Sequence, residues 1–117
     1  MLRLIDRTVR AARRAGRPVS VCGEMASNPL AVPILVGLGI QELSGTASTV
    51  PVVKEIVRAL DAQEAEQDAR CALEAGSAAE VHAIATRRLR ESGLLEHPDI
   101  GSWLAGVVNG AEGALGR

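Results

Sequence analysis

The sequence predicts an α/β fold with two strand–helix units followed by further helices. Two short apolar, β-favouring runs, at 19–22 and 40–44, are each followed by a helical pattern. This alternation implies that the two strands are parallel and joined by a right-handed crossover. Two parallel strands alone would leave two exposed edges, whereas such sheets are normally larger and covered on both faces. The sheet is therefore expected to be a piece of a barrel.

Length and charge exclude several classes of protein. The chain has 117 residues and a formal net charge of −1, so it is one small domain with no global excess of positive charge for nucleic acid or anionic lipid. No apolar stretch approaches the roughly 20 residues of a membrane span. The two cysteines fit neither a disulfide framework nor a paired metal signature. We therefore expect a cytoplasmic protein that binds neither nucleic acid nor membrane.

The chain begins with an amphipathic helical pattern. Leu2, Ile5, Val9 and Ala12 lie on one helical face, and Gly16 ends the pattern. The first 18 residues contain six arginines and one acid, which superficially resembles an organelle-targeting segment. An ordinary amphipathic helix explains the same residues, and it leads directly into the first strand.

A short helix is expected between the two strands. Asn28 is its predicted cap and Pro29 its first helical residue. Pro33 limits the helix to a short one, because proline inside a helix removes a hydrogen bond. Gly37 and Gly39 are predicted to end the helix before the second strand.

The second strand leads through a small polar loop, 45–49, into another helix. Ser48 or Thr49 is the predicted cap, and Pro51 falls in the first turn. The apolar residues of this helix recur at helical spacing. They are Val53, Ile56, Val57 and Leu60.

Two further helices and a glycine-rich tail complete the chain. Residues 61–75 are rich in Ala, Glu and Gln, which favours a helix ending at Gly76. Ser77 and Glu80 have the spacing of a capping box, so another helix should run to about Ser92. In the tail, five apolar residues have the spacing of a short amphipathic helix, with Trp103 expected as a core anchor rather than a partner contact. They are Ile100, Trp103, Leu104, Val107 and Val108.

Three segments together resemble one enzyme family. They read VCGEMA at 21–26, NPLAVPILVGLG at 28–39 and ELS at 42–44. These segments are similar to the last quarter of the phosphoenolpyruvate-binding barrel of enzyme I, the phosphoenolpyruvate-protein phosphotransferase of bacterial sugar transport. Pyruvate phosphate dikinase and phosphoenolpyruvate synthase share this barrel. On this resemblance, residues 1–92 are the C-terminal part of a (β/α)8 TIM barrel, and 93–117 are a glycine-rich tail.

The resemblance also implies a site at the carboxyl ends of the strands. The seventh barrel strand would end at Cys22 and the eighth near Ser44. The family cysteine at this position is the acid/base that protonates C3 of the pyruvate enolate. A free thiol suits this role because it is mostly protonated at neutral pH. Gly23, as a candidate substrate-binding residue, would allow close approach of the ligand.

Other residues carry weaker expectations. Without the family resemblance, Cys22 would be interpreted as a small buried hydrophobic residue, and Cys71 is interpreted as core or surface filler. Glu24 is expected to have a structural role such as a salt bridge. Gly45 departs from the family, which usually has Met or Val there, so the shape of this loop is open. His82 and His97, the two histidines, match no phosphohistidine motif.

The remaining family machinery is expected from elsewhere. In the family, the phosphohistidine, the phosphate-binding arginines and the acidic ligands of magnesium lie in earlier segments, which would precede Met1. We therefore expect no cofactor or metal site in this chain alone, and whether it acts as an enzyme stays open. Three hypotheses follow. The chain is a phosphotransferase fragment completed by the missing barrel portion, a self-associating non-catalytic module or remnant, or a free-standing binder of phosphoenolpyruvate or pyruvate.

Overall fold

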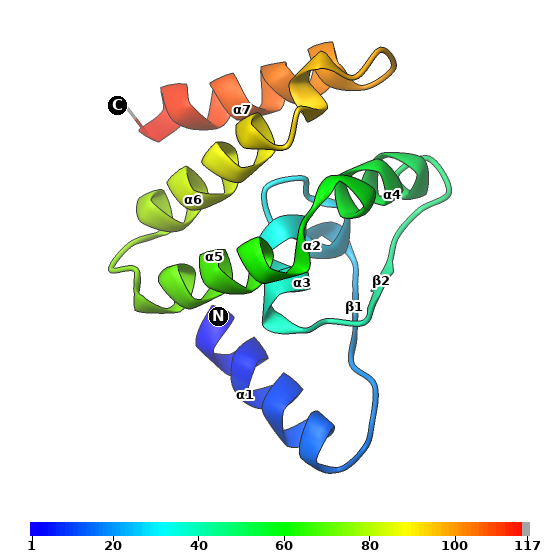
Figure 1. Ribbon diagram of the computed structural model, residues 1–117, viewed down its shortest axis with the longest axis vertical. Coiled ribbons are helices and arrows are strands. Elements are labelled where there is room, and N and C mark those ends of the chain that lie inside the picture. Colours follow the sequence, from blue (N-terminus) through cyan, green and yellow to red (C-terminus); the bar gives the residue numbers. More distant parts are fainter. Residues whose placement is uncertain (116–117) are drawn as a thin grey trace.

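The computed structural model describes the backbone of residues 1–115 and the side chains of residues 1–111. Helices dominate the fold, and the two strands run side by side along one flank (Figure 1). No helix in residues 1–115 has the length and apolar character needed to cross a membrane. In chain order the elements are α1 (Leu2–Arg14), β1 (Ser20–Cys22), α2 (Glu24–Ser27), α3 (Val32–Leu38), β2 (Glu42–Ser44), α4 (Val50–Ala59), α5 (Ala62–Glu74), α6 (Ala78–Glu91), the 3-10 helix η1 (Leu94–Glu96) and α7 (Gly101–Leu115).

The two strands form a parallel sheet, which confirms the predicted α/β class and strand pairing. Val21 lies opposite Leu43, and both side chains are half-buried against a cluster that contains Val9 of α1. The residues on either side of this pair are exposed, as the pleat of a strand requires when only one face is covered. The helices therefore cover one face of the sheet and leave the other open.

The helix between the strands begins later than predicted. Asn28 Oδ1 accepts a hydrogen bond from the backbone N–H of Leu30 at 3.0 Å, so Asn28 caps a turn rather than a helix. Pro29 lies in that turn, and α3 starts at Val32. Pro33 thereby falls in the first helical turn, where its missing N–H costs nothing.

Gly37 was predicted to end this helix, but it lies inside α3 at the crossing with α5. A Cβ atom at Gly37 would overlap the carbonyl group of Ala65 and lie 2.9 Å from Cβ of Ala69. The helix ends instead at Gly39, whose φ of 97° is left-handed. Glycine at 37 therefore sets how closely α3 and α5 can pack.

Capping differs among the helices. The predicted side-chain cap of α4 is wrong, because Thr49 precedes the helix with a helical backbone and no capping hydrogen bond from its side chain. Asp61 caps α5 by accepting hydrogen bonds from the N–H groups of Gln63 and Glu64, each at 3.0 Å. The capping box of α6 is confirmed in part. Ser77 Oγ accepts from the N–H of Glu80 at 3.2 Å, while the Glu80 carboxylate accepts from the N–H of Gly76 at 2.7 Å.

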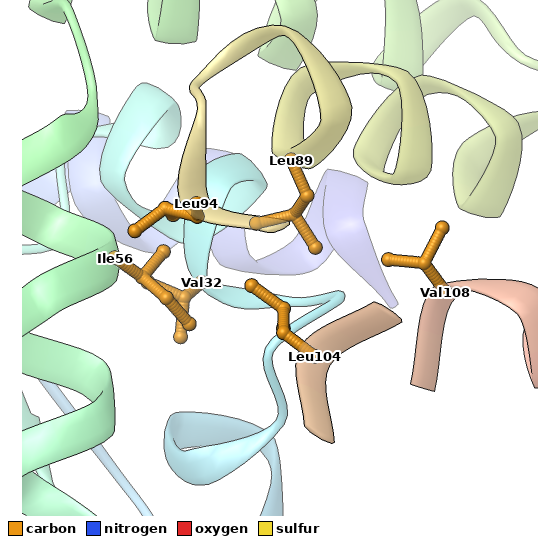
Figure 2. Packing of buried hydrophobic residues seen from close by; sticks show 6 residues of the cluster. All are labelled: Val32, Ile56, Leu89, Leu94, Leu104 and Val108. Atoms are coloured by element: carbon orange, nitrogen blue, oxygen red, sulfur yellow. The ribbon is translucent and has the colours of Figure 1, made fainter. Parts of the chain in front are cut away.

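The C-terminal helices close the main apolar cluster. Six fully or nearly buried side chains from α3, α4, α6, η1 and α7 converge there (Figure 2). They are Val32, Ile56, Leu89, Leu94, Leu104 and Val108. The helical spacing in the tail thus corresponds to α7, but the expectation for Trp103 is wrong. Its side chain is 51% exposed, because Leu104 and Val108 occupy the face of α7 that meets the core.

A buried ionic network joins α5 to α6. Asp68 is nearly inaccessible, and its Oδ2 accepts a hydrogen bond from Arg88 Nε at 2.5 Å while its Oδ1 accepts from Arg88 Nη2 at 3.2 Å. These hydrogen bonds raise the pKa of Arg88 above its ordinary value. Burial acts in the opposite direction, and the charges of Asp68, Glu64 and Glu91 raise the pKa further. The guanidinium therefore remains charged at every pH at which the protein would be studied.

Candidate functional site

The carboxyl ends of the two strands bring Cys22 and Ser44 side by side. These residues are register partners at the last position of each strand, and both are exposed on the uncovered face of the sheet. Ser20 and Glu42 form the preceding pair on the same face. The expectation of a buried Cys22, drawn without the family resemblance, is therefore wrong. Cys71 is also exposed, but on α5.

Gly23 turns the chain sharply after Cys22. Its φ of 86° and ψ of −160° lie in a region that is essentially restricted to glycine. The turn leads directly into α2, a helix of four residues that the sequence patterns did not predict. A Cβ atom at Gly23 would have no atom within 4 Å, so the space in front of the residue is open. Glycine is thus required here by the backbone conformation and not by crowding.

Hydroxyl groups tie the two strand-end loops together. Ser27 Oγ, at the end of α2, lies 3.2 Å from Thr49 Oγ1, which also donates to the carbonyl oxygen of Thr46 at 2.9 Å. A Cβ atom at Gly45 would lie 2.5 Å from Ser27 Oγ and 2.7 Å from Thr49 Oγ1. A side chain at position 45 would therefore require these two hydroxyl groups to move, which is consistent with glycine at this position.

The two strands and the loops that follow them carry no basic residue of their own, and the first cations after them in sequence, Lys54 and Arg58 of α4, line a separate hollow with Ser27 and Thr49. Residues 18–53, which hold both strands and both loops, contain no lysine or arginine. A hollow beside Ser44 has one carboxylate among its lining residues, that of Glu24. Glu24 makes no ion pair within residues 1–111, so the predicted salt bridge is not found there. The lining residues are Gly23, Glu24, Ser27, Ser44, Gly45, Thr46 and Thr49.

The residues present do not build a metal centre by themselves. Magnesium prefers several oxygen ligands in octahedral geometry. Within the described residues, no three His, Cys, Asp or Glu side chains come together in a way that could hold a metal ion. His97 is instead turned toward α4, with its Nε2 3.5 Å from Glu55 Oε2.

The fold and the site together define a parallel α/β segment whose polar strand ends form the candidate site. A family model described as the PEP-binding domain of PEP-utilising enzymes matches residues 1–62. The chain belongs to this family of PEP-utilising enzymes. The matched segment contains both strands, both connecting loops and α4, and so includes every residue of the candidate site.

Several longer proteins are similar to the chain. A phosphoenolpyruvate-protein phosphotransferase from Haloferax volcanii is 46% identical over 86 residues, covering 74% of this chain and 15% of the relative. A phosphotransferase of the same name from Geobacillus stearothermophilus is 38% identical over 87 residues, with the same two coverages. A multiphosphoryl transfer protein from Escherichia coli O6:H1 is 39% identical over 85 residues, covering 73% of this chain and 10% of the relative. The chain thus spans only 10–15% of the length of these relatives.

Proposed function

We propose that the chain supplies the last two strand–helix units of a phosphoenolpyruvate-binding (β/α)8 barrel and that Cys22 is its proton donor. In this role the Cys22 thiol protonates C3 of the enolate that remains after phosphoenolpyruvate gives up its phosphoryl group. The observation that carries the proposal is the position of Cys22. It is exposed at the carboxyl end of a parallel strand, where active sites of such barrels lie.

The two faces of the sheet support the barrel. Val21 and Leu43 pack toward the helices, as strand residues on the outer side of a barrel would. Ser20, Cys22 and Ser44 are exposed on the opposite face, which would line the interior. Both outer strand edges lack a partner in the two-stranded sheet, so further parallel strands can add on either side.

The lack of basic residues at the site supports the view that other strands of the barrel provide the phosphate-binding groups. Phosphoryl transfer depends on cations that neutralise the charge developing on the phosphoryl group. Residues 18–53 provide none, and the described residues do not gather magnesium ligands. The phosphate-binding cations and any magnesium would therefore come from the remaining barrel strands. On this proposal the chain alone is not competent for phosphoryl transfer.

A chimera tests the proposal. The 86 residues of this chain that align with the Haloferax volcanii phosphotransferase, at 46% identity, would replace the matching segment of that enzyme. Phosphoenolpyruvate-dependent phosphorylation of the enzyme would be measured for the chimera and for its Cys22→Ala and Cys71→Ala variants. Because a positioned general acid contributes about 10²–10⁴-fold, we expect Cys22→Ala to lower the rate at least about 100-fold.

The second cysteine is the matched control. Cys71 is exposed like Cys22 but lies on α5, so Cys71→Ala should leave the rate of the chimera within about twofold. Equal rates for the two variants would contradict the role of Cys22. An inactive chimera that folds would contradict the assignment of the segment to the barrel.

The free strand edges also favour a second candidate function, a self-associating module without catalysis. The edges of a two-stranded parallel sheet are templates for pairing with another chain. Light scattering coupled to size exclusion would measure the mass of the isolated chain in solution. A closed oligomer would support self-association, whereas a folded monomer would contradict it.

A further inference from the structure

Ser44 differs from the other hydroxyl-bearing residues at the strand ends. Thr46 Oγ1 lies 3.2 Å from Ser48 Oγ and 3.3 Å from Thr49 Oγ1, and Thr49 in turn reaches Ser27. These four residues hold the two loops together. Ser44 takes no part in this network, and within residues 1–111 its hydroxyl has no hydrogen-bond partner. The network gives each of the other four hydroxyl groups a structural role in joining the loops, whereas Ser44 has no such role.

The sheet register places this free hydroxyl beside the thiol of Cys22. Neighbouring strands lie about 4.8 Å apart, and register partners project to the same face. Cys22 also has no hydrogen-bond partner within residues 1–111, and both side chains are exposed. Because the two side chains share a face at neighbouring positions, a rotation of the Ser44 side chain about its Cα–Cβ bond would turn the hydroxyl toward the sulfur atom.

Loss of the Cys22 proton would create an electrostatic problem that a hydroxyl can relieve. On the open face of the sheet, the charged groups next to Cys22 and Ser44 are carboxylates, Glu42 on β2 and Glu24 at the start of α2. The cations of α4, Lys54 and Arg58, line a different hollow together with Leu43 of the covered face. The α3 helix has no ionisable residue, and α1 contacts the opposite face of the sheet through Val9. A thiolate at this position would therefore face negative charge and need a hydrogen-bond donor.

We propose that Ser44 is a positioning residue for Cys22, whose hydroxyl donates a hydrogen bond to the sulfur as the thiol loses its proton. This proposal rests on the proton-donor role proposed above. The S–H bond of Cys22 breaks and its electron pair stays on sulfur, while the π electrons of the enolate form the new C3–H bond. The Ser44 O–H bond stays intact throughout and orients and stabilises the thiolate. In the reverse direction the same hydrogen bond holds the thiolate ready to accept a proton from pyruvate.

The reactivity of the thiol in the full 117-residue chain tests the proposal without requiring catalysis. Iodoacetamide would alkylate the folded protein at pH 7, and peptide mass spectrometry would follow Cys22 and Cys71 separately. Because alkylation needs the thiolate, loss of the hydrogen bond in Ser44→Ala should slow Cys22 alkylation about threefold. Cys71 should react at an unchanged rate, since it lies on α5. Ser44→Thr, which keeps a hydroxyl, should restore the rate of Cys22.

Ser48→Ala is the matched control, because it removes a hydroxyl from the neighbouring loop network and not from the strand end. An unchanged rate for Cys22 in Ser44→Ala would overturn the proposal. So would an equal slowing by Ser48→Ala, or by Ser44→Ala at both cysteines, since either would indicate general loosening of the loops. Equal rates for the Cys22→Ala and Cys71→Ala chimeras, combined with the expected alkylation rates, would reject the catalytic role of Cys22 while retaining its contact with Ser44.

Discussion

The crossing of α3 and α5 predicts that a single methyl group at position 37 destabilises the fold. A Cβ atom at Gly37 would overlap the Ala65 carbonyl group and approach Ala69 Cβ to 2.9 Å. Backbone atoms cannot rotate away as a flexible side chain can, so the two helices must separate. Separation would weaken the contacts of the apolar cluster that includes Ile34 and Leu38.

The expected magnitude follows from two opposing effects. Overpacking of a close contact costs about 1–3 kcal/mol and sometimes more, and a helix–helix contact through backbone lies at the upper end of this range. Replacing glycine by alanine in a helix recovers about 1 kcal/mol. The Gly37→Ala variant should therefore lose about 2 kcal/mol of unfolding free energy, which lowers the Tm by about 8 °C for a domain of this size.

A second glycine provides a control in which the same substitution should change the unfolding free energy in the opposite direction. Gly106 lies in α7, is exposed, and would have no atom within 4 Å of an added Cβ. Gly106→Ala should therefore raise the unfolding free energy by about 0.5–1 kcal/mol. Thermal unfolding followed by far-UV circular dichroism measures both variants. If Gly37→Ala stabilised the protein as Gly106→Ala does, the reasoning about the helix crossing would be refuted.

Four further predictions concern the ionic network, the turn at Gly23 and the exposure of Trp103. Asp68→Ala should lower the unfolding free energy, measured by urea denaturation, by about 3 kcal/mol, because it leaves the Arg88 guanidinium, which is only 12% exposed, without its main partner. Glu66→Ala breaks an exposed ion pair and should lower it by less than about 0.5 kcal/mol. Folding raises the pKa of Arg88, so the contribution of this residue to the unfolding free energy is fully present at every pH below the ordinary pKa of arginine. That contribution should therefore not vary between about pH 5 and 9, and its loss in this range would contradict the network. Gly23→Ala should cost about 1–3 kcal/mol because alanine is strained at φ 86° and ψ −160°, and an unchanged Tm would exclude this turn. Trp103 should be quenched by iodide in the folded protein nearly as well as in urea, and protection from iodide would contradict its exposed position.

Local patterns predicted most of the secondary structure because hydrogen bonds between residues close in sequence determine it. The helical periods of α1, α4 and α6 and the cap at Ser77 depend on neighbours at most four positions away. The motif around Cys22 similarly indicated the family, which the family model matching residues 1–62 confirms. The predicted start of α3 was wrong because Asn28 can cap either a turn or a helix, and only contacts with neighbouring elements select between the two.

The sequence by itself determined the order of elements, the parallel pairing of two strands and the residues that identify the family. Only the tertiary structure decided which residues of each helix and strand are covered by the rest of the protein. In the sequence, Gly37 and Gly39 both predict the end of a helix. Only the packing of Gly37 against Ala65 shows that α3 and α5 cross at this residue. Trp103 fits the helical period of its apolar neighbours, yet α6 and η1 meet α7 on another face. The pairing of Cys22 with Ser44 likewise depends on register, which is set by helices packing between strands 22 positions apart.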